Sequence, residues 1–416
     1  MSQGPILIFD NSALQSLNPD EAAWLDNFFL TNITPLFFIE TLADLEKEVH
    51  AGRTAEDVVG NLALKTPDMQ SSPGVHHQRL IGVDLRGEER VVLDGRIPRA
   101  GGKVVKLDGK SGVMFLRTEE EEALYRWQRH EFLDLERQVA KTWRRALSNV
   151  DHSDMYEFFQ QWFRYGKPKT LAEVKALADG CIDGPDQEAS FRFGLTLLGA
   201  LQAPQAEILA RWQKAGRPLI RQFAPYFHYV YSVDLFFNLA VAANQISRVR
   251  PAGKADNKVD IAYLYYLPFC QVFTSCDNLH ERVVPLFLRN DQSFVKGPDL
   301  KADLRKLDEH YSALPEEVKR TGFHKFADCP PEDTSFLVTR LWDQHLPAWR
   351  KLKAEKKEPD QSKHKRLVEH LNRIEREAES SDPSARLSVE ETEYIQIVRH
   401  VTRKKGKWDR FGPDVK

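Results

Sequence analysis

Short apolar runs that end in polar residues define the predicted core. Residues 5–9 are continuously apolar, which is typical of a strand covered on both faces of a parallel sheet. A second run at residues 36–39 predicts another strand, which leads into an amphipathic helix through Leu42 and Leu45. Residues 256–267 predict a helix with an acidic start, and buried strands are predicted at Val272–Phe273 and near residues 294–295. This pattern predicts an α/β fold with a central, mostly parallel sheet flanked by helices.

The remaining segments divide into an insertion and an extension. Residues 1–50 and 235–300 form the predicted core, which is therefore discontinuous in sequence. Residues 71–117 carry short alternating runs between Gly and Pro residues, which indicates β-hairpins in a small β subdomain. Residues 118–234 read as a helical insertion that starts with a capping box at Thr118, and residues 301–416 read as a helical extension with a basic tail.

Composition agrees with a soluble protein. The chain has 416 residues, of which 29% are charged and 42% hydrophobic, with a net charge of −2. This balance excludes a broad nucleic-acid-binding coat, so any such contact must be a local patch. The four cysteines show no metal-ligand spacing and are expected to be reduced. The start lacks a secretion signal, and the most apolar segment, 226–243, contains polar residues and is expected to be a buried helix rather than a membrane span; we expect a cytoplasmic protein.

Four acidic residues occupy related places in the predicted elements. Asp10 and Asp277 follow the carboxyl ends of predicted strands, whereas Glu40 and Asp260 lie in the first turns of predicted helices. In open α/β sheets ligands bind outside the carboxyl ends of the strands. We therefore expect the four carboxylates to gather at one edge of the sheet.

The ordered set of acids resembles the PIN (PilT N-terminus) domain nucleases. The matching segments are Asp10 with Ser12, Phe38-Ile39-Glu40-Thr41-Leu42, Val259-Asp260-Ile261-Ala262 and Thr274-Ser275-Cys276-Asp277. The resemblance covers residues 4–50 and about 235–295, and it departs from a compact PIN domain in the long segment between Glu40 and Asp260 and in the carboxyl-terminal extension. It implies a metal-dependent nuclease, with RNA favoured over DNA as substrate.

An oxygen-dominated ligand set favours Mg²⁺ or Mn²⁺. We expect Asp10, Glu40, Asp260 and Asp277 to act as ligands and catalytic residues, with Asn11, Ser12 and Ser275 orienting them from behind or contacting phosphate. A basic run near the carboxyl terminus could contact nucleic acid: Arg399, Arg403, Lys404, Lys405 and Lys407. A solvated tail is the alternative for this run.

Other interpretations stay open at this stage. Each acid alone is typical of a turn or of a first helical turn, where the helix dipole favours a negative charge, and Asp256 competes with Asp260. The chain could instead be a non-catalytic PIN-like scaffold that binds nucleic acid, a protein partner or a second copy of itself. A phosphatase of the strand-Asp type would need an acid at position 12, where Ser12 stands.

Overall fold

The fold centres on a parallel five-stranded sheet. The structure is a computed structural model that describes residues 4–49, 52–88, 91–98, 103–107, 110–115, 118–139, 142, 158–160, 163, 166–199, 205–246, 256–355, 373, 376, 394–397 and 400–413. The strand order is β3 (Ser71–Pro73), β2 (Leu30–Ile33), β1 (Ile6–Phe9), β6 (Val272–Ser275) and β7 (Ser293–Lys296). All four neighbouring pairs are parallel, which confirms the predicted α/β class.

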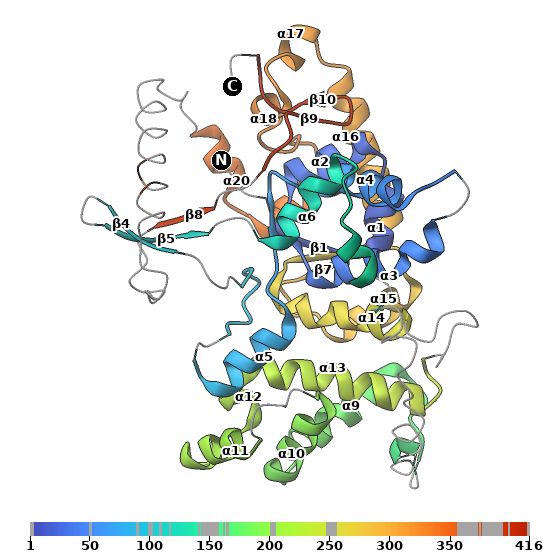
Figure 1. The fold of residues 1–416 in the computed structure, drawn as a ribbon, viewed down its shortest axis with the longest axis vertical. Coiled ribbons are helices and arrows are strands. Elements are labelled where there is room, and N and C mark those ends of the chain that lie inside the picture. Colours follow the sequence, from blue (N-terminus) through green and yellow to red (C-terminus); the bar gives the residue numbers. More distant parts are fainter. Residues whose placement is uncertain are drawn as a thin grey trace.

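Helices cover both faces of this sheet (Figure 1). Alternate residues of β1 enter two different hydrophobic clusters: Ile8 belongs to one, and Leu7 and Phe9 belong to the other. The Ile8 cluster contains α5 (His77–Arg86), α9 (Leu171–Ile182), α13 (Pro225–Ala242) and the 3₁₀ segment η2 (Tyr263–Phe269). The Leu7 cluster contains α2 (Pro19–Phe28), α4 (Ala55–Lys65), α16 (Gly297–Ser312) and α19 (Leu337–His345).

The predicted strand at residues 36–39 is wrong. These residues lie in α3 (Pro35–Glu48), and the second strand is β2, a few residues earlier. Pro35 stands at the first helical position, where its missing N–H costs nothing. The strand itself has the sequence Leu-Thr-Asn-Ile, whose buried Asn32 donates to the Phe269 carbonyl oxygen at 3.3 Å. The polar Thr31 and Asn32 therefore hid the strand, while the apolar run belonged to a helix that is buried on several sides.

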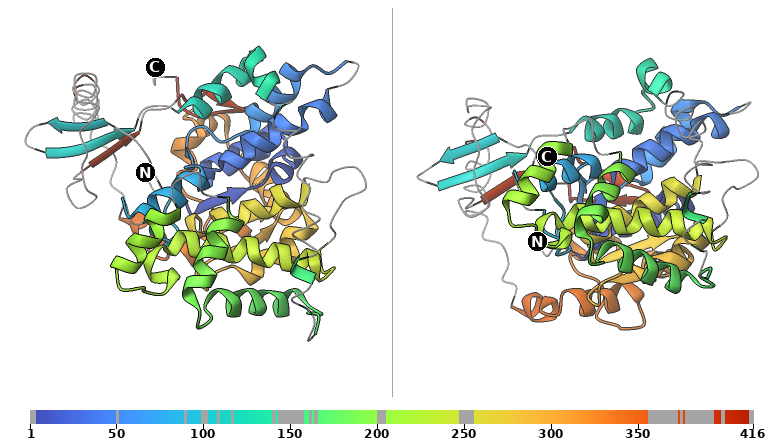
Figure 2. Two further views of the ribbon diagram at one scale, coloured as in Figure 1. Left: turned by 60° about the horizontal axis from the view of Figure 1, so that its bottom comes forward. Right: turned by 90° about the horizontal axis from the view of Figure 1, so that it is seen from below.

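The 71–117 segment is only partly the predicted β subdomain. Its first residues form β3, an edge strand of the main sheet, and α5 follows. The hairpin prediction is confirmed for β4 (Lys103–Leu107) and β5 (Lys110–Phe115), which pair antiparallel. A distant strand, β8 (Tyr394–Ile397), pairs parallel with β5 and completes a small sheet that stands out from the main body in both views of Figure 2.

The predicted helical insertion is confirmed where the structure describes it. It contains α6 (Glu119–Gln128), α9, α10 (Gln187–Leu197), α11 (Gln205–Lys214), α12 (Ile220–Phe223) and the start of α13. The predicted capping box is present, because the Thr118 side chain accepts from the Glu121 N–H and the Glu121 carboxylate accepts from the Thr118 N–H. None of the helices among the described residues is both long and apolar enough to cross a membrane.

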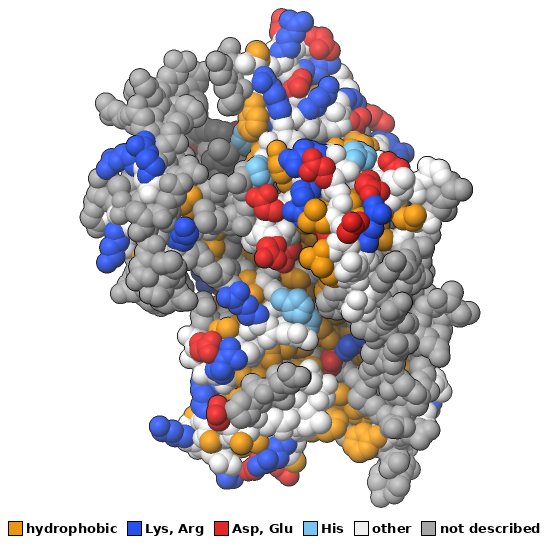
Figure 3. All heavy atoms as spheres, viewed as in Figure 1, with side chains coloured by type: hydrophobic (Ala, Val, Ile, Leu, Met, Phe, Trp, Pro, Cys, Tyr) orange, Lys and Arg blue, Asp and Glu red, His pale blue; other side chains and the backbone are white. Residues whose placement is uncertain are grey.

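The carboxyl-terminal extension begins with helices and ends in short strands. After α16 come α17 (Glu316–Lys319), α18 (Phe323–Phe326), α19 and α20 (Trp349–Ala354). The chain then returns as β8 and as the antiparallel pair β9 (Lys404–Lys405) and β10 (Trp408–Asp409). Acidic and basic side chains are intermixed on the face drawn in Figure 3, in keeping with the small net charge.

Candidate functional site

The candidate site lies where the winding direction of the sheet reverses. β1 pairs with β2 on one side and with β6 on the other, so the chain winds outward in both directions from this point. Asp10 follows β1, Asp277 follows β6 after Cys276, and the Asp10 N–H donates to the Thr274 carbonyl oxygen at 3.3 Å. Crevices at such reversals are the usual ligand sites of doubly wound sheets.

Asp10 is the centre of a buried hydrogen-bond network. Its side chain is 4% exposed and caps α1 (Asn11–Ser16) by accepting the Ala13 N–H at 2.8 Å. The Ser12 hydroxyl lies 2.9 and 2.8 Å from the two carboxylate oxygens, and the Ser275 hydroxyl lies 2.6 Å from Oδ2. The two serines therefore hold the Asp10 carboxylate in one orientation.

His280 is a member of this network that the sequence reasoning missed. It lies in α15 (Asn278–Val283), is fully buried, and places Nδ1 2.7 Å from the Ser275 hydroxyl and 3.4 Å from Asp10 Oδ2. Its Nε2 lies 2.7 Å from the Asp260 carbonyl oxygen. Burial opposes protonation, but Asp10 and Asp260 outweigh it and raise the pKa of His280 to about 9. The pKa of Asp10 is lowered: burial opposes ionisation and His280 outweighs it.

Glu40 is the carboxylate of the site whose negative charge is least favourable. It lies in α3, where its carboxylate accepts the Tyr263 hydroxyl proton at 2.7 Å. Burial, followed by the negative charges of Asp10, Asp260 and Asp44, raises the pKa of Glu40 to about 8. Asp10, Glu40 and Asp260, three of the four predicted carboxylates, therefore lie close enough for their charges to interact. Asp44, one helical turn after Glu40, joins them without having been predicted.

Asp277 has a different local role. Its side chain caps α15 by accepting the Leu279 N–H at 2.6 Å, and its own N–H donates to Ser275 at 2.9 Å. It therefore meets the site through Ser275. Asp260 lies in α14 (Asp256–Ala262), half-buried, and its backbone oxygen accepts from His280.

The donor chemistry of the site fits a hard cation, although the side chains as placed do not form a closed ligand shell. Within the described part of the chain, no three His, Cys, Asp or Glu side chains are arranged to hold one metal ion. Glu40 gives one oxygen to Tyr263, and Asp10 is held by Ser12 and Ser275. The other oxygen of Glu40 could coordinate a cation while Tyr263 holds the first. A divalent charge there would also relieve the repulsion that raises the Glu40 pKa.

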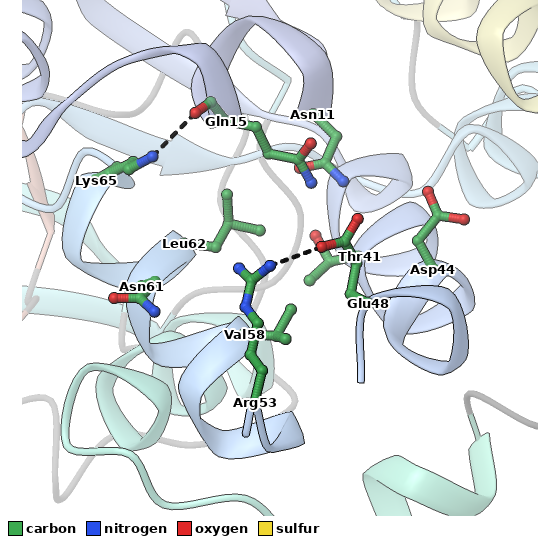
Figure 4. Close-up of a pocket in the computed structure, with 10 residues that line it drawn as sticks. All are labelled: Asn11, Gln15, Thr41, Asp44, Glu48, Arg53, Val58, Asn61, Leu62 and Lys65. Carbon is green, nitrogen blue, oxygen red and sulfur yellow. Dashed lines mark hydrogen bonds and ion pairs between the residues drawn. The ribbon is translucent and has the colours of Figure 1, made fainter. Parts of the chain in front are cut away.

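A cavity of about 240 Å³ lies beside the acids, between α1, α3 and α4 (Figure 4). Asn11 and Thr41 line it near the predicted site, together with Asp44 and Glu48 from α3. The full lining is Asn11, Gln15, Thr41, Asp44, Glu48, Arg53, Val58, Asn61, Leu62 and Lys65. Asn11 was expected to orient ligands, and it is 2% exposed with no hydrogen-bond partner for Oδ1 among the described residues.

The predicted basic contact surface is wrong for Lys405. This side chain is 4% exposed and lies 3.6 Å from an Asp26 oxygen and 3.7 Å from an Asp68 oxygen, so it cannot also grip a phosphate. Lys407 is ion-paired with Asp308 at 2.5 Å. Arg403 and Lys404 are exposed and stay candidates for such a contact, whereas Arg399 lies outside the described residues.

Comparisons with protein-family models, with curated proteins and with solved structures found no match for this chain. The candidate site therefore rests on its own residues and geometry.

Proposed function

We propose that this protein is a metal-dependent nuclease that hydrolyses phosphodiester bonds at the carboxyl-terminal edge of its sheet. The observation that carries the proposal is the placement of Asp10 at the carboxyl end of β1 near Glu40 and Asp260: Tyr263 donates to Glu40, and His280 contacts both Asp10 and the Asp260 carbonyl oxygen. Burial and the charges of Asp10, Asp260 and Asp44 raise the pKa of Glu40. Such a group of acids costs free energy unless a cation is present, and perturbed carboxylates in a crevice are typical of functional sites. Mg²⁺ or Mn²⁺ suits oxygen ligands, and the resemblance to PIN domains favours RNA as the substrate.

In this mechanism Glu40 and Asp260 contribute the ligand oxygens, and Asp10 contributes a carboxylate that is already oriented. A bound Mg²⁺ or Mn²⁺ would supply an activated water and neutralise charge on the phosphate. Ser12 and Ser275 hold Asp10 in place, and protonated His280 balances its charge from the buried side. Tyr263 keeps Glu40 turned toward the site through its hydroxyl. Asp277 would act through its contact with Ser275 and through water.

The second candidate is a non-catalytic scaffold that binds nucleic acid or a protein. The observation in its favour is the saturation of Asp10, whose carboxylate already receives Ala13, Ser12 and Ser275 as donors and stands beside His280. In this interpretation Asp10 is a structural cap for α1, and the acids bind no metal.

The discriminating experiment compares Glu40→Gln and Asp260→Asn with wild type. With Mn²⁺ and a labelled single-stranded RNA, wild type should cleave, and both variants should lose at least about a hundredfold in rate, or about 2.7 kcal/mol of barrier. Without divalent ions, Glu40→Gln should unfold at a higher temperature than wild type, because it removes a buried acid under repulsion. Glu207→Gln, an exposed position in α11, is the matched control.

The scaffold predicts a different result from the same samples. Wild type would show neither cleavage nor Mn²⁺-dependent stabilisation, and RNA would remain intact in every variant. Stabilisation of wild type by Mn²⁺ that disappears in Glu40→Gln would support the metal site even before a preferred substrate is found.

A further inference from the structure

The cavity beside the acids has a built interior rather than an accidental gap. Its apolar wall comes from Val58 and Leu62, both buried. Asn11 lies between the cavity and the Asp10 network, and its Oδ1 is buried without a hydrogen-bond donor among the described residues. A buried acceptor of this kind is unfavourable unless a ligand or water supplies the donor. The cavity therefore contains a position at which an N–H group of a ligand would be favourable.

Both cations and acids line the cavity. In Figure 4 the Arg53 guanidinium reaches into the centre, Lys65 lies at one side, and Asp44 lies at the other. Arg53 is ion-paired with Glu48 at 2.9 Å, and the Lys65 ammonium donates to the Gln15 carbonyl oxygen at 2.9 Å. Both side chains are only half-buried, so each can exchange its present partner for a ligand.

A third cation, Lys301, lies near Lys65. Lys301 of α16 donates to the Ser16 carbonyl oxygen at the end of α1. Burial and the charges of Lys301 and Arg53 lower the pKa of Lys65, and Glu21 offsets them only in part. The same Lys301 charge acts on Cys276, the residue before Asp277. Lys301 is therefore a third cation near Lys65, and it also lies 3.9 Å from Glu21. A group of neighbouring cations attracts an anion.

We propose that this cavity is a nucleotide subsite of the nuclease, in which Lys65 and Arg53 bind a backbone phosphate next to the bond being cut and Asn11 Oδ1 accepts an N–H of the base. The subsite rests on the proposed function, since it gives the nucleic acid its position relative to the acids. Its volume of about 240 Å³ is large enough for a single nucleobase. Arg53 would leave Glu48, and Lys65 would leave the Gln15 carbonyl oxygen, to bind the phosphate.

The test is the binding of a fluorescein-labelled single-stranded RNA dodecamer in EDTA, where cleavage cannot occur. Lys65→Gln and Arg53→Gln should each weaken binding about tenfold, the effect of one lost charged hydrogen bond, and should reduce the salt dependence of log K by about 0.7 per phosphate contact. Glu48→Gln should tighten binding, because it releases Arg53. Lys214→Gln, an exposed lysine at the end of α11, should leave binding unchanged.

Cleavage by the same variants with Mn²⁺ separates this proposal from the nuclease itself. Equal affinity and equal salt slope in wild type, Lys65→Gln and Arg53→Gln would overturn the subsite, as would the absence of RNA binding by wild type. Cleavage lost in Glu40→Gln alone would then leave the nuclease standing. Conversely, if RNA binding depends on Lys65 and Arg53 but no sample cleaves the RNA, the result would support the subsite and contradict the proposed nuclease activity. Thermal unfolding of each variant checks its fold, and the opposite sign expected for Glu48→Gln does not depend on destabilisation.

Discussion

At the scale of single residues, the site combines one stabilised carboxylate with one destabilised carboxylate. Asp10 gains donors from two serines and a backbone N–H and a cation from His280, and its pKa is lowered although burial opposes this. Glu40 has one hydrogen bond, from Tyr263, and its pKa is raised to about 8 by burial and by neighbouring acids. The surroundings of Asp10 thus favour its negative charge, whereas the surroundings of Glu40 disfavour its negative charge.

These two titrations predict how stability depends on pH. The folded protein holds a proton on Glu40 between about 4.5 and about 8, and on His280 between 6.5 and about 9, where the unfolded chain has lost it. The free energy of unfolding should therefore fall as the pH rises through each window, by at most about 1.4 kcal/mol per pH unit for each group. Urea unfolding in EDTA from pH 5 to 9 measures this slope. Glu40→Gln should flatten it below pH 8, and an unchanged slope in that variant would refute the assignment.

His280 should be the residue of the network least tolerant of substitution. His280→Ala leaves the buried Asp10 charge without its cation and the Asp260 carbonyl oxygen without its donor. Removing one partner of a buried ion pair costs about 3–5 kcal/mol, and the loss should shrink when Asp10→Asn is added. Chemical denaturation of the two single variants and the double variant measures the coupling. Strictly additive losses would show that the two side chains do not stabilise each other.

Sequence reasoning found the acids at this scale but not their partners. Asp10 and Asp277 could be predicted because each follows an apolar strand and precedes a helix that it caps. His280 gave no signal, since a single histidine inside Asn-Leu-His-Glu-Arg-Val has no motif, and its role depends on Ser275 and Asp10 meeting across the sheet. Asp44 could have been suggested by its spacing of one helical turn from Glu40, but only once residues 36–39 were placed in a helix.

At the scale of elements, hydrophobic periodicity distinguished helices from strands better where the apolar run was long or began with a helix cap. The capping box predicted at Thr118 marks a real helix start, and β1, β6 and β7 were apolar enough to be predicted. The run at 36–39 was ambiguous because four apolar residues suit a buried strand and a buried helix equally. Strand β8 depends on a partner hundreds of residues away, as the pairing of Met114 with Gln396 shows. No local pattern contains such pairing.

The carboxyl-terminal segment should stabilise the core through buried ion pairs. Arg410 is fully buried, lies 2.7 Å from an Asp26 oxygen and contacts Asp68, and Lys405 lies beside both acids. Burial opposes ionisation of Asp26, yet Arg410 and Lys405 outweigh it and lower its pKa. Arg410→Ala should therefore cost about 3–5 kcal/mol in the free energy of unfolding, with little rescue by salt.

An exposed ion pair in the same segment provides the control for the buried Arg410–Asp26 pair. Lys407 pairs with Asp308, but its side chain is 47% exposed. Lys407→Ala should cost less than about 1 kcal/mol, because water and salt screen such pairs. Equal losses for Arg410→Ala and Lys407→Ala, measured by denaturant unfolding, would mean that burial does not distinguish the two contacts.

At the scale of the whole molecule, hydrogen bonds join the inserted helices to the elements around the candidate site. The Tyr226 and Tyr229 hydroxyls of α13 donate to the carbonyl oxygens of Tyr265 and Leu264, at 3.1 and 2.9 Å. These carbonyls belong to η2, whose Tyr263 bonds Glu40. One chain of contacts therefore runs from the inserted helices through η2 to Glu40 in the candidate site.

This continuity predicts a single cooperative unfolding unit. Leu235 is fully buried in α13, and Leu235→Ala should cost about 2–5 kcal/mol, whereas Leu352→Ala, at a position that is 59% exposed, should change stability by at most about 0.5 kcal/mol. Because α13 supports η2 and η2 lies against β1, hydrogen exchange should show amide protection falling together in α13 and in α2 on the opposite face of the sheet. An independent inserted domain would lose protection in α9 to α13 alone. In that case the Mn²⁺-dependent stabilisation of the core would survive Leu235→Ala, and the insertion would have to act on the site by some route other than Tyr263.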